Sequence, residues 1–109
     1  MKRGAIVVVA ARGAYTGKPR PALVVQTDLF NPTHASITVC PITSDCVDAP
    51  LFRVTLPPGA RTGLRQPSQV MIDKIVSVPR ATISAEIGQC EASELEAVAD
   101  GLRRWLELD

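Results

Sequence analysis

The stretch GKPRPALVV, Gly17–Val25, places a lysine and an arginine around two prolines, directly before a run of apolar residues. Such a run is typical of a buried β-strand, and we expect this strand to cover Pro21–Asp28. Proline fixes the backbone φ angle, so Pro19 and Pro21 stiffen the chain on both sides of Arg20. An arginine held in this way at the start of a strand is a candidate for binding an anion.

Further segments of strand length lie on both sides of this one. The patterns predict strands over Ala5–Ala10, Ser36–Thr43 and Leu51–Leu56, and either one long bent strand or two short ones over Ser68–Val78. Pro41 cannot donate a ladder hydrogen bond, so we expect it at an edge, an end or a bulge. Short strands joined by loops rich in proline and glycine predict a small curled β-barrel.

The C-terminal segment changes to a helical period. Apolar residues recur at i, i+3, i+4 and i+7, namely Leu95, Val98, Ala99, Leu102, Trp105 and Leu106. Ser93 and Glu96 fit a capping box, so the helix should begin between Glu91 and Ser93. We expect this stripe, with Trp105, to pack on the sheet. Gly101 within the helix marks either a close contact or a marginal helix.

The composition indicates a folded chain whose charge is unevenly distributed. Hydrophobic residues make up 46% of the 109 positions, and we expect one domain spanning residues 1–109. Residues 1–80 hold ten Lys and Arg against four Asp and Glu, whereas residues 81–109 hold two against seven. The front of the chain is therefore the part expected to meet an anion. The alternative, that these are ordinary solvated surface charges, stays open.

Several classes of protein lack their signatures here. The sequence contains no glycine-rich nucleotide-binding motif, no HExxH and no GxSxG. Cys40, Cys46 and Cys90 show no metal-binding spacing, and we expect neither a metal nor a cofactor. The apolar run Ala5–Ala11 is short for a signal peptide and is followed by Arg12, and no stretch approaches the roughly 20 apolar residues of a membrane span. We therefore expect a cytoplasmic protein with no membrane partner.

Residues suited to phosphate chemistry stand at the ends of two expected strands. Arg20 begins one strand, and Thr43 and Ser44 end another. If the two strands are antiparallel neighbours, a guanidinium group and two hydroxyl groups meet at one rim. A guanidinium group donates two parallel hydrogen bonds to a phosphate and stays charged. RNA carries its own nucleophile, the 2′-hydroxyl, so aligning the attack and stabilising charge suffices without a metal.

Taken together, the segments resemble the MazF/PemK family of toxin endoribonucleases. The resemblance rests on KRGAIVVVA, GKPRPALVVQTDLFN, TVCPITS, RVTLPP and SQVMIDKIVSVPRATI, and it runs from Arg3 to the final helix. It implies a mainly β fold, an SH3-like or CcdB-like small barrel with a C-terminal helix, acting as a homodimer. The implied activity is metal-independent, sequence-specific cleavage of single-stranded RNA, leaving 2′,3′-cyclic phosphate and 5′-hydroxyl ends. A cognate antitoxin is the expected protein partner.

The resemblance also implies roles for individual residues. Arg20 and Thr43 match the catalytic arginine and threonine of the family. The residues expected to bind substrate are Arg12, Lys18, Ser44, Ser68 and Gln69. Ser68 stands where some members carry an acidic residue that serves as a base, and either Asp73 or Arg65 is a candidate to compensate.

Two other functions remain open from the sequence. CcdB-like toxins resemble the same fold but bind DNA gyrase through a tryptophan near the C-terminus, and Trp105 lies near the end of this chain. A degenerate toxin that retains only antitoxin binding is the second alternative, which the serine at position 68 keeps open. Cleavage of RNA separates the nuclease from both.

Overall fold

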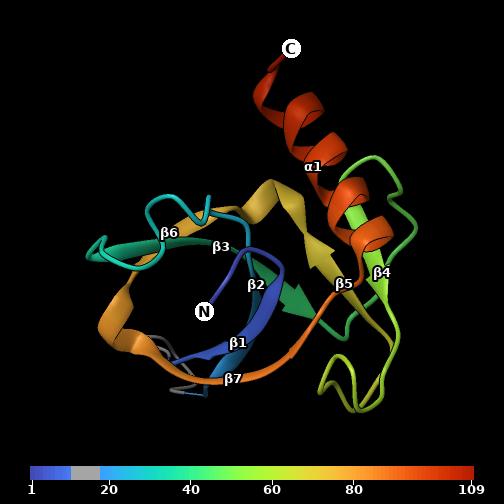
Figure 1. Ribbon diagram of the computed structural model, residues 1–109. Helices are drawn as coiled ribbons and strands as arrows, with labels where there is room; N and C mark the ends of the chain where they lie inside the picture. The colour runs from blue at the N-terminus through green and yellow to red at the C-terminus, as the bar shows by residue number, and fades with distance from the viewer. Residues whose placement is uncertain (11–17) are drawn as a thin grey trace.

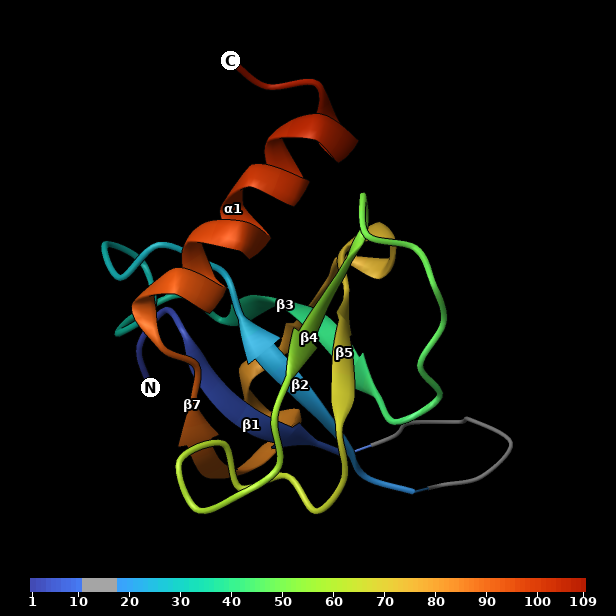
Figure 2. The ribbon, with the colours of Figure 1, turned by 90° about the vertical axis from the view of Figure 1, so that its right-hand side faces the viewer.

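The computed structural model describes residues 1–10 and 18–109, which form an antiparallel sheet curled around itself with one helix against it (Figures 1 and 2). In chain order the elements are β1 (Ala5–Val9), β2 (Arg20–Val24), β3 (Ser36–Thr43), β4 (Arg53–Leu56), β5 (Ser68–Met71), the 3-10 helix η1 (Ile72–Lys74), β6 (Val76–Pro79), the 3-10 helix η2 (Arg80–Thr82), β7 (Ile83–Gln89) and α1 (Ala92–Leu106). The mainly β fold with a C-terminal helix is confirmed.

Strand β3 is the centre of the sheet. The strand order is β4-β5-β3-β2-β1-β7, and β6 also pairs with β3. Residues 36–39 of β3 pair with β6, whereas residues 42–43 pair with β5. Pro41 pairs with Ala22 of β2, and on its other side it lies between these two ladders. Its missing N–H therefore interrupts neither ladder, although the strand is an internal one.

The sequence of β1 is apolar throughout because the strand is buried on both faces. Ile6 belongs to a core cluster that also contains Val98 of α1, whereas Ala5 and Val7 belong to a second cluster. The second cluster consists of Ala5, Val7, Ala22, Val24, Ile37 and Val39. A strand between two apolar layers reads as a continuous run rather than an alternation.

Helix α1 begins where the sequence predicts, but through a different cap. Glu91 is the N-cap, and its N–H donates to the Glu94 side chain at 2.9 Å, which places the capping box two residues before the predicted Ser93 and Glu96. The reason is that Cys90 N–H still donates to the Gly4 carbonyl at 3.0 Å, so the chain is free to turn only at the next residue.

Gly101 marks a close contact between α1 and η1, the first of the two alternatives that the sequence left open. A Cβ atom at this position would lie 2.3 Å from Cδ1 of Ile72, whose side chain is buried. Glycine thus lets the helix approach the sheet, at a cost in helix propensity of about 1 kcal/mol relative to alanine.

The expectation that Trp105 is buried was wrong. Its side chain is 51% exposed, and its ring lies 6.0 Å from that of Phe52. The C-terminal half of α1 extends past the sheet (Figure 2), so its apolar stripe is only partly covered. Within residues 1–10 and 18–109, no helix is long and apolar enough to cross a membrane.

Several strand boundaries also differ from the prediction, since β1 ends at Val9 rather than Ala10 and β4 begins at Arg53 rather than Leu51. Strand β2 ends at Val24 rather than Asp28, because the carbonyl of Thr27 accepts hydrogen bonds from Phe30 and Asn31 in a turn. Strand β7 was not predicted at all. The expected segment Ser68–Val78 forms two short strands, β5 and β6, which η1 separates.

Candidate functional site

Arg20 and Thr43 lie at the same end of two paired strands. Strands β2 and β3 are antiparallel, with Ala22 opposite Pro41. Continuing this register by two residues along each strand brings Arg20 level with Thr43. The predicted meeting of the guanidinium group and the hydroxyl group at one rim is therefore what the structure shows.

A cavity of about 180 Å³ opens at this rim. Its lining consists of Arg20, Pro21, Ile42, Thr43, Ser44, Leu64, Arg65, Gln66 and Ser68. The lining thus holds two guanidinium groups and three hydroxyl groups, and none of these residues carries a carboxylate. A site with this charge is suited to an oxyanion such as a phosphate.

Both guanidinium groups are available for a ligand. Arg20 and Arg65 are exposed, and within the part of the chain that the structure describes neither side chain forms a hydrogen bond or an ion pair. Arg65 comes from the loop before β5, and it reaches the rim because β5 pairs with the end of β3. Of the two residues considered as compensating for Ser68, Arg65 lines the cavity and Asp73 does not.

The hydroxyl groups of the cavity differ in what they can offer. Thr43 Oγ1 accepts a hydrogen bond from Asp45 N–H at 3.0 Å, which leaves the hydroxyl hydrogen able to donate. Ser68 Oγ already donates to the Gln66 carbonyl at 2.9 Å, and its side chain is almost fully buried. The Ser68 hydroxyl hydrogen is therefore already used within the protein, and Ser68 only forms part of the cavity lining. Thr43 can bind a phosphate oxygen.

Two of the residues expected to bind substrate, Gln69 and Lys18, do not line this cavity. The Gln69 amide bonds to both backbone groups of Val47, and it lines a separate hollow with Arg53. Lys18 is exposed just before β2 but is not part of the lining. Arg12 lies outside the described residues. Sequence reasoning thus grouped Gln69 with the substrate contacts, although its hydrogen bonds are with the protein itself.

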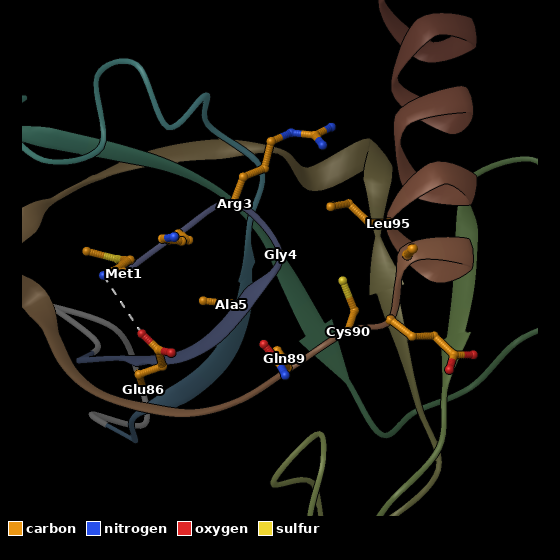
Figure 3. Close-up of a pocket in the computed structure, with 11 residues that line it drawn as sticks. Met1, Arg3, Gly4, Ala5, Glu86, Gln89, Cys90 and Leu95 are labelled. Atoms are coloured by element: carbon orange, nitrogen blue, oxygen red, sulfur yellow. Dashed lines mark ion pairs between the residues drawn. The ribbon is translucent and has the colours of Figure 1, made fainter.

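A larger hollow of about 470 Å³ lies at the opposite end of β1, beside the start of α1 (Figure 3). Its charges are mixed, because Glu86 and Glu91 line it together with Lys2 and Arg3. The amino group of Met1 lies 3.9 Å from Glu86. Opposed charges make this hollow a poorer site for a polyanion than the rim that holds Arg20.

Groups of three or more His, Cys, Asp or Glu side chains that could hold a metal ion are absent from residues 1–10 and 18–109. The family model of the PemK-like, MazF-like toxins of type II toxin–antitoxin systems matches residues 2–106. The chain belongs to this family. Among individual MazF proteins, the probable endoribonuclease MazF of Mycolicibacterium smegmatis is 47% identical over 95 residues, which cover 87% of this chain and 86% of that protein.

Other members of the MazF family are similar over nearly the whole chain. Endoribonuclease MazF9 of Mycobacterium tuberculosis is 33% identical over 116 residues, covering 99% of this chain and 98% of the relative. The structure of Mycobacterium tuberculosis toxin MazF-mt6 aligns with a TM-score of 0.82 at 27% identity, covering 96% and 98% of the two chains. The MazE-MazF structure from Deinococcus radiodurans gives 0.81 at 25% identity, covering 100% and 97%. These relationships favour the MazF reading over the CcdB-like alternative.

Proposed function

We propose that this MazF-family chain is a cytoplasmic endoribonuclease that cleaves single-stranded RNA at a short sequence, without a metal. The observation that carries the proposal is the cavity that Arg20, Arg65 and Thr43 line together, in which no carboxylate is found among the described lining residues. The relatives named endoribonuclease MazF support it, since one of them is 47% identical over 87% of this chain. Single-stranded RNA fits because its backbone is free to align for in-line attack.

In the proposed reaction, the 2′-oxygen of RNA forms a bond to the adjacent phosphorus, and the bond from phosphorus to the 5′-oxygen breaks. Water takes the proton from the 2′-hydroxyl, because the described residues that line the cavity offer no carboxylate as a base. A second proton from water goes to the 5′-oxygen as it leaves. The products are a 2′,3′-cyclic phosphate and a 5′-hydroxyl.

The protein contributes charge and alignment to this step. Arg20 binds the two non-bridging oxygens of the phosphate through its planar guanidinium group, and it stabilises the extra negative charge of the pentavalent transition state. The hydroxyl group of Thr43 donates to one of the same oxygens, and Ser44 assists. Arg65 binds the next phosphate along the strand, a role that adds affinity without sequence preference.

Partners of this chain are proposed on the same grounds. The solved MazE-MazF structure of Deinococcus radiodurans supports binding of a cognate antitoxin. An acidic antitoxin segment would compete with RNA for Arg20 and Arg65 by charge complementarity. A homodimer is supported by exposed apolar side chains around the end of α1, since Trp105 is 51% and Leu108 60% exposed. Leu51, whose carbonyl accepts a hydrogen bond from Arg104, is 68% exposed.

The test is cleavage of a mixed-sequence single-stranded RNA by the purified protein in EDTA, with the new ends mapped. Arg20→Lys keeps the charge but loses the planar guanidinium group that donates two parallel hydrogen bonds. Thr43→Val keeps the shape of the side chain but loses the hydroxyl group. Arg103→Ala serves as the matched control, because Arg103 is an exposed arginine paired with Asp100 on α1. We expect cuts at one short motif that leave 5′-hydroxyl ends.

Both active-site variants should cleave at least about a hundredfold more slowly, and Arg103→Ala at the wild-type rate. Absence of cleavage by folded wild-type protein would show that the proposed activity is wrong and would favour a degenerate toxin that binds only antitoxin. Light scattering on the same protein tests the dimer, which Leu108→Glu should weaken.

A further inference from the structure

Gln69 and Arg53 form a cluster beside Thr43 that the proposed reaction does not use. Gln69 Oε1 accepts from Val47 N–H at 3.0 Å, and Gln69 Nε2 donates to the Val47 carbonyl at 2.9 Å. The side chain thus binds the loop as a neighbouring strand would, through one donor and one acceptor. It is only 8% exposed, so water competes little for these bonds.

Arg53 fixes the orientation of this amide and holds a second point of the same loop. Its Nη1 donates to Gln69 Oε1 at 2.9 Å, which leaves Nε2 to face the Val47 carbonyl. The same nitrogen lies 3.3 Å from the Asp45 carbonyl. Among the described residues Arg53 forms no ion pair, and its buried Nε has no acceptor. Its charge is therefore directed at the loop and at Gln69.

The loop that these two side chains hold ends at the hydroxyl group of Thr43. Asp45 contributes both ends of the link, because its carbonyl accepts from Arg53 while its N–H donates to Thr43 Oγ1 at 3.0 Å. With one lone pair of Oγ1 occupied in this way, the hydroxyl hydrogen points elsewhere. A chain of hydrogen bonds thus runs from Gln69 and Arg53 to the group proposed to bind phosphate.

We infer that Gln69 and Arg53 are positioning residues for Thr43, an inference that rests on the proposed function of that threonine. They clamp residues 45–47, and the clamped Asp45 N–H sets the direction in which the Thr43 hydroxyl group donates. This role differs from binding substrate. Loss of the clamp lowers kcat and leaves KM nearly unchanged, since Gln69 does not line the cavity.

The experiment compares Gln69→Leu with Gln26→Leu. Gln26 also bonds one backbone N–H and one carbonyl, but at the other end of β3 from Thr43. Its Oε1 accepts from Thr38 N–H at 3.0 Å and its Nε2 donates to the Ser36 carbonyl at 3.3 Å. Amide hydrogen exchange is measured at Asp45 and Val47 in each variant. Steady-state RNA cleavage, which gives kcat and KM, is measured in the wild-type and Thr43→Val backgrounds.

We expect Gln69→Leu to speed exchange at both amides and to lower kcat about ten- to hundredfold, whereas Gln26→Leu does neither. In the Thr43→Val background, Gln69→Leu should lower kcat by no more than about a further twofold. An equal loss in both backgrounds, or a rise in KM with kcat unchanged, would overturn the inference.

Failure of the proposed nuclease activity is recognised separately. If wild-type protein cuts no RNA, amide hydrogen exchange alone still tests whether Gln69 holds residues 45–47. Unchanged protection of the Asp45 and Val47 amides in Gln69→Leu would reject that role.

Discussion

Thr43 and Gln69 lie directly opposite each other across the ladder between β3 and β5. Residues paired in this way project their side chains from the same face of the sheet. Thr43 lines the cavity that Arg20 also lines, and Gln69 binds the loop that follows β3. The pairing explains how one end of the ladder between β3 and β5 both presents the hydroxyl group proposed to bind phosphate and holds the backbone that orients it.

Arg65 should contribute to RNA binding rather than to the chemical step. Arg65→Ala is expected to raise KM about tenfold with kcat changed little, because it removes one phosphate contact outside the scissile position. RNA binding by this variant should release about one counterion fewer, so the slope of the logarithm of the binding constant against the logarithm of salt concentration should be shallower. Fluorescence anisotropy over a range of salt concentrations measures this slope, with Arg103→Ala as the control. A loss confined to kcat would instead place Arg65 at the reacting phosphate.

The rate of cleavage should rise with pH without a plateau. With no carboxylate among the residues that the structure shows lining the cavity, the 2′-hydroxyl proton goes to water or hydroxide in the proposed reaction. The single-turnover rate should then rise about tenfold per unit between pH 6 and pH 8. Ser68→Asp places a carboxylate in the same wall and should flatten this profile. A bell-shaped curve for the wild-type protein would reveal a side chain acting as the base.

Gly101→Ala should destabilise the fold although alanine favours helix. Its methyl group would meet Cδ1 of Ile72, and overpacking of this kind costs about 1–3 kcal/mol. Chemical denaturation measures the free energy of unfolding. Adding Ile72→Val removes the clashing atom and should recover part of the loss. If Gly101→Ala alone proves stabilising, the contact between α1 and η1 is looser than the structure has it.

Glu94 should stabilise the start of α1 in a pH-dependent way. Partial burial opposes ionisation, but hydrogen bonds from Arg61 and from Glu91 N–H outweigh it, so the pKa of Glu94 lies below its ordinary value of 4.5. A carboxyl group with a lowered pKa stabilises the fold above its unfolded pKa, and this stability is lost as the pH falls through the folded value.

Glu94→Gln should therefore lower the free energy of unfolding by about 1 kcal/mol at pH 7 and by less as the pH falls below about 4. Denaturation at both pH values checks this, and the exposed Glu96→Gln is the matched control on the same helix. A loss that stays constant with pH would mean that the ion pair with Arg61 contributes nothing and that only the cap matters.

Much of the fold can be predicted from the sequence, because most of its strands and its helix have strong local sequence patterns. Strand β3 covers Ser36–Thr43 as predicted, since its β-branched residues and flanking turns leave little ambiguity. Strand β7 was missed because its sequence, ISAEIGQ, contains serine, alanine, glutamate and glycine, which do not favour strands on their own. Pairing with β1 makes it a strand, and a pairing partner is not a local property.

The candidate site was also only partly predictable from the sequence. Arg20 and Thr43 were found from the ends of their strands, and their meeting follows from antiparallel pairing. The family resemblance implies that Gln69 binds substrate, but its hydrogen bonds are with Val47 and Arg53. Side chains alternate along a strand, so Gln69 does not share the direction of its neighbour Ser68. No local signal distinguishes an amide that binds a ligand from one that binds a loop.

The sequence alone determined most of the strands, the helix, the family resemblance and the two residues at the centre of the rim, because β-branched runs, helical periodicity and a proline-flanked arginine are local features. It did not determine β7, whose strand conformation depends on pairing with β1. Only the tertiary structure decided which groups share the cavity. It added Arg65, moved Gln69 to the loop that follows Thr43, and left Trp105 half exposed. The physical reason is that hydrogen-bond partners and burial depend on strand register and packing, which bring together residues far apart in the chain.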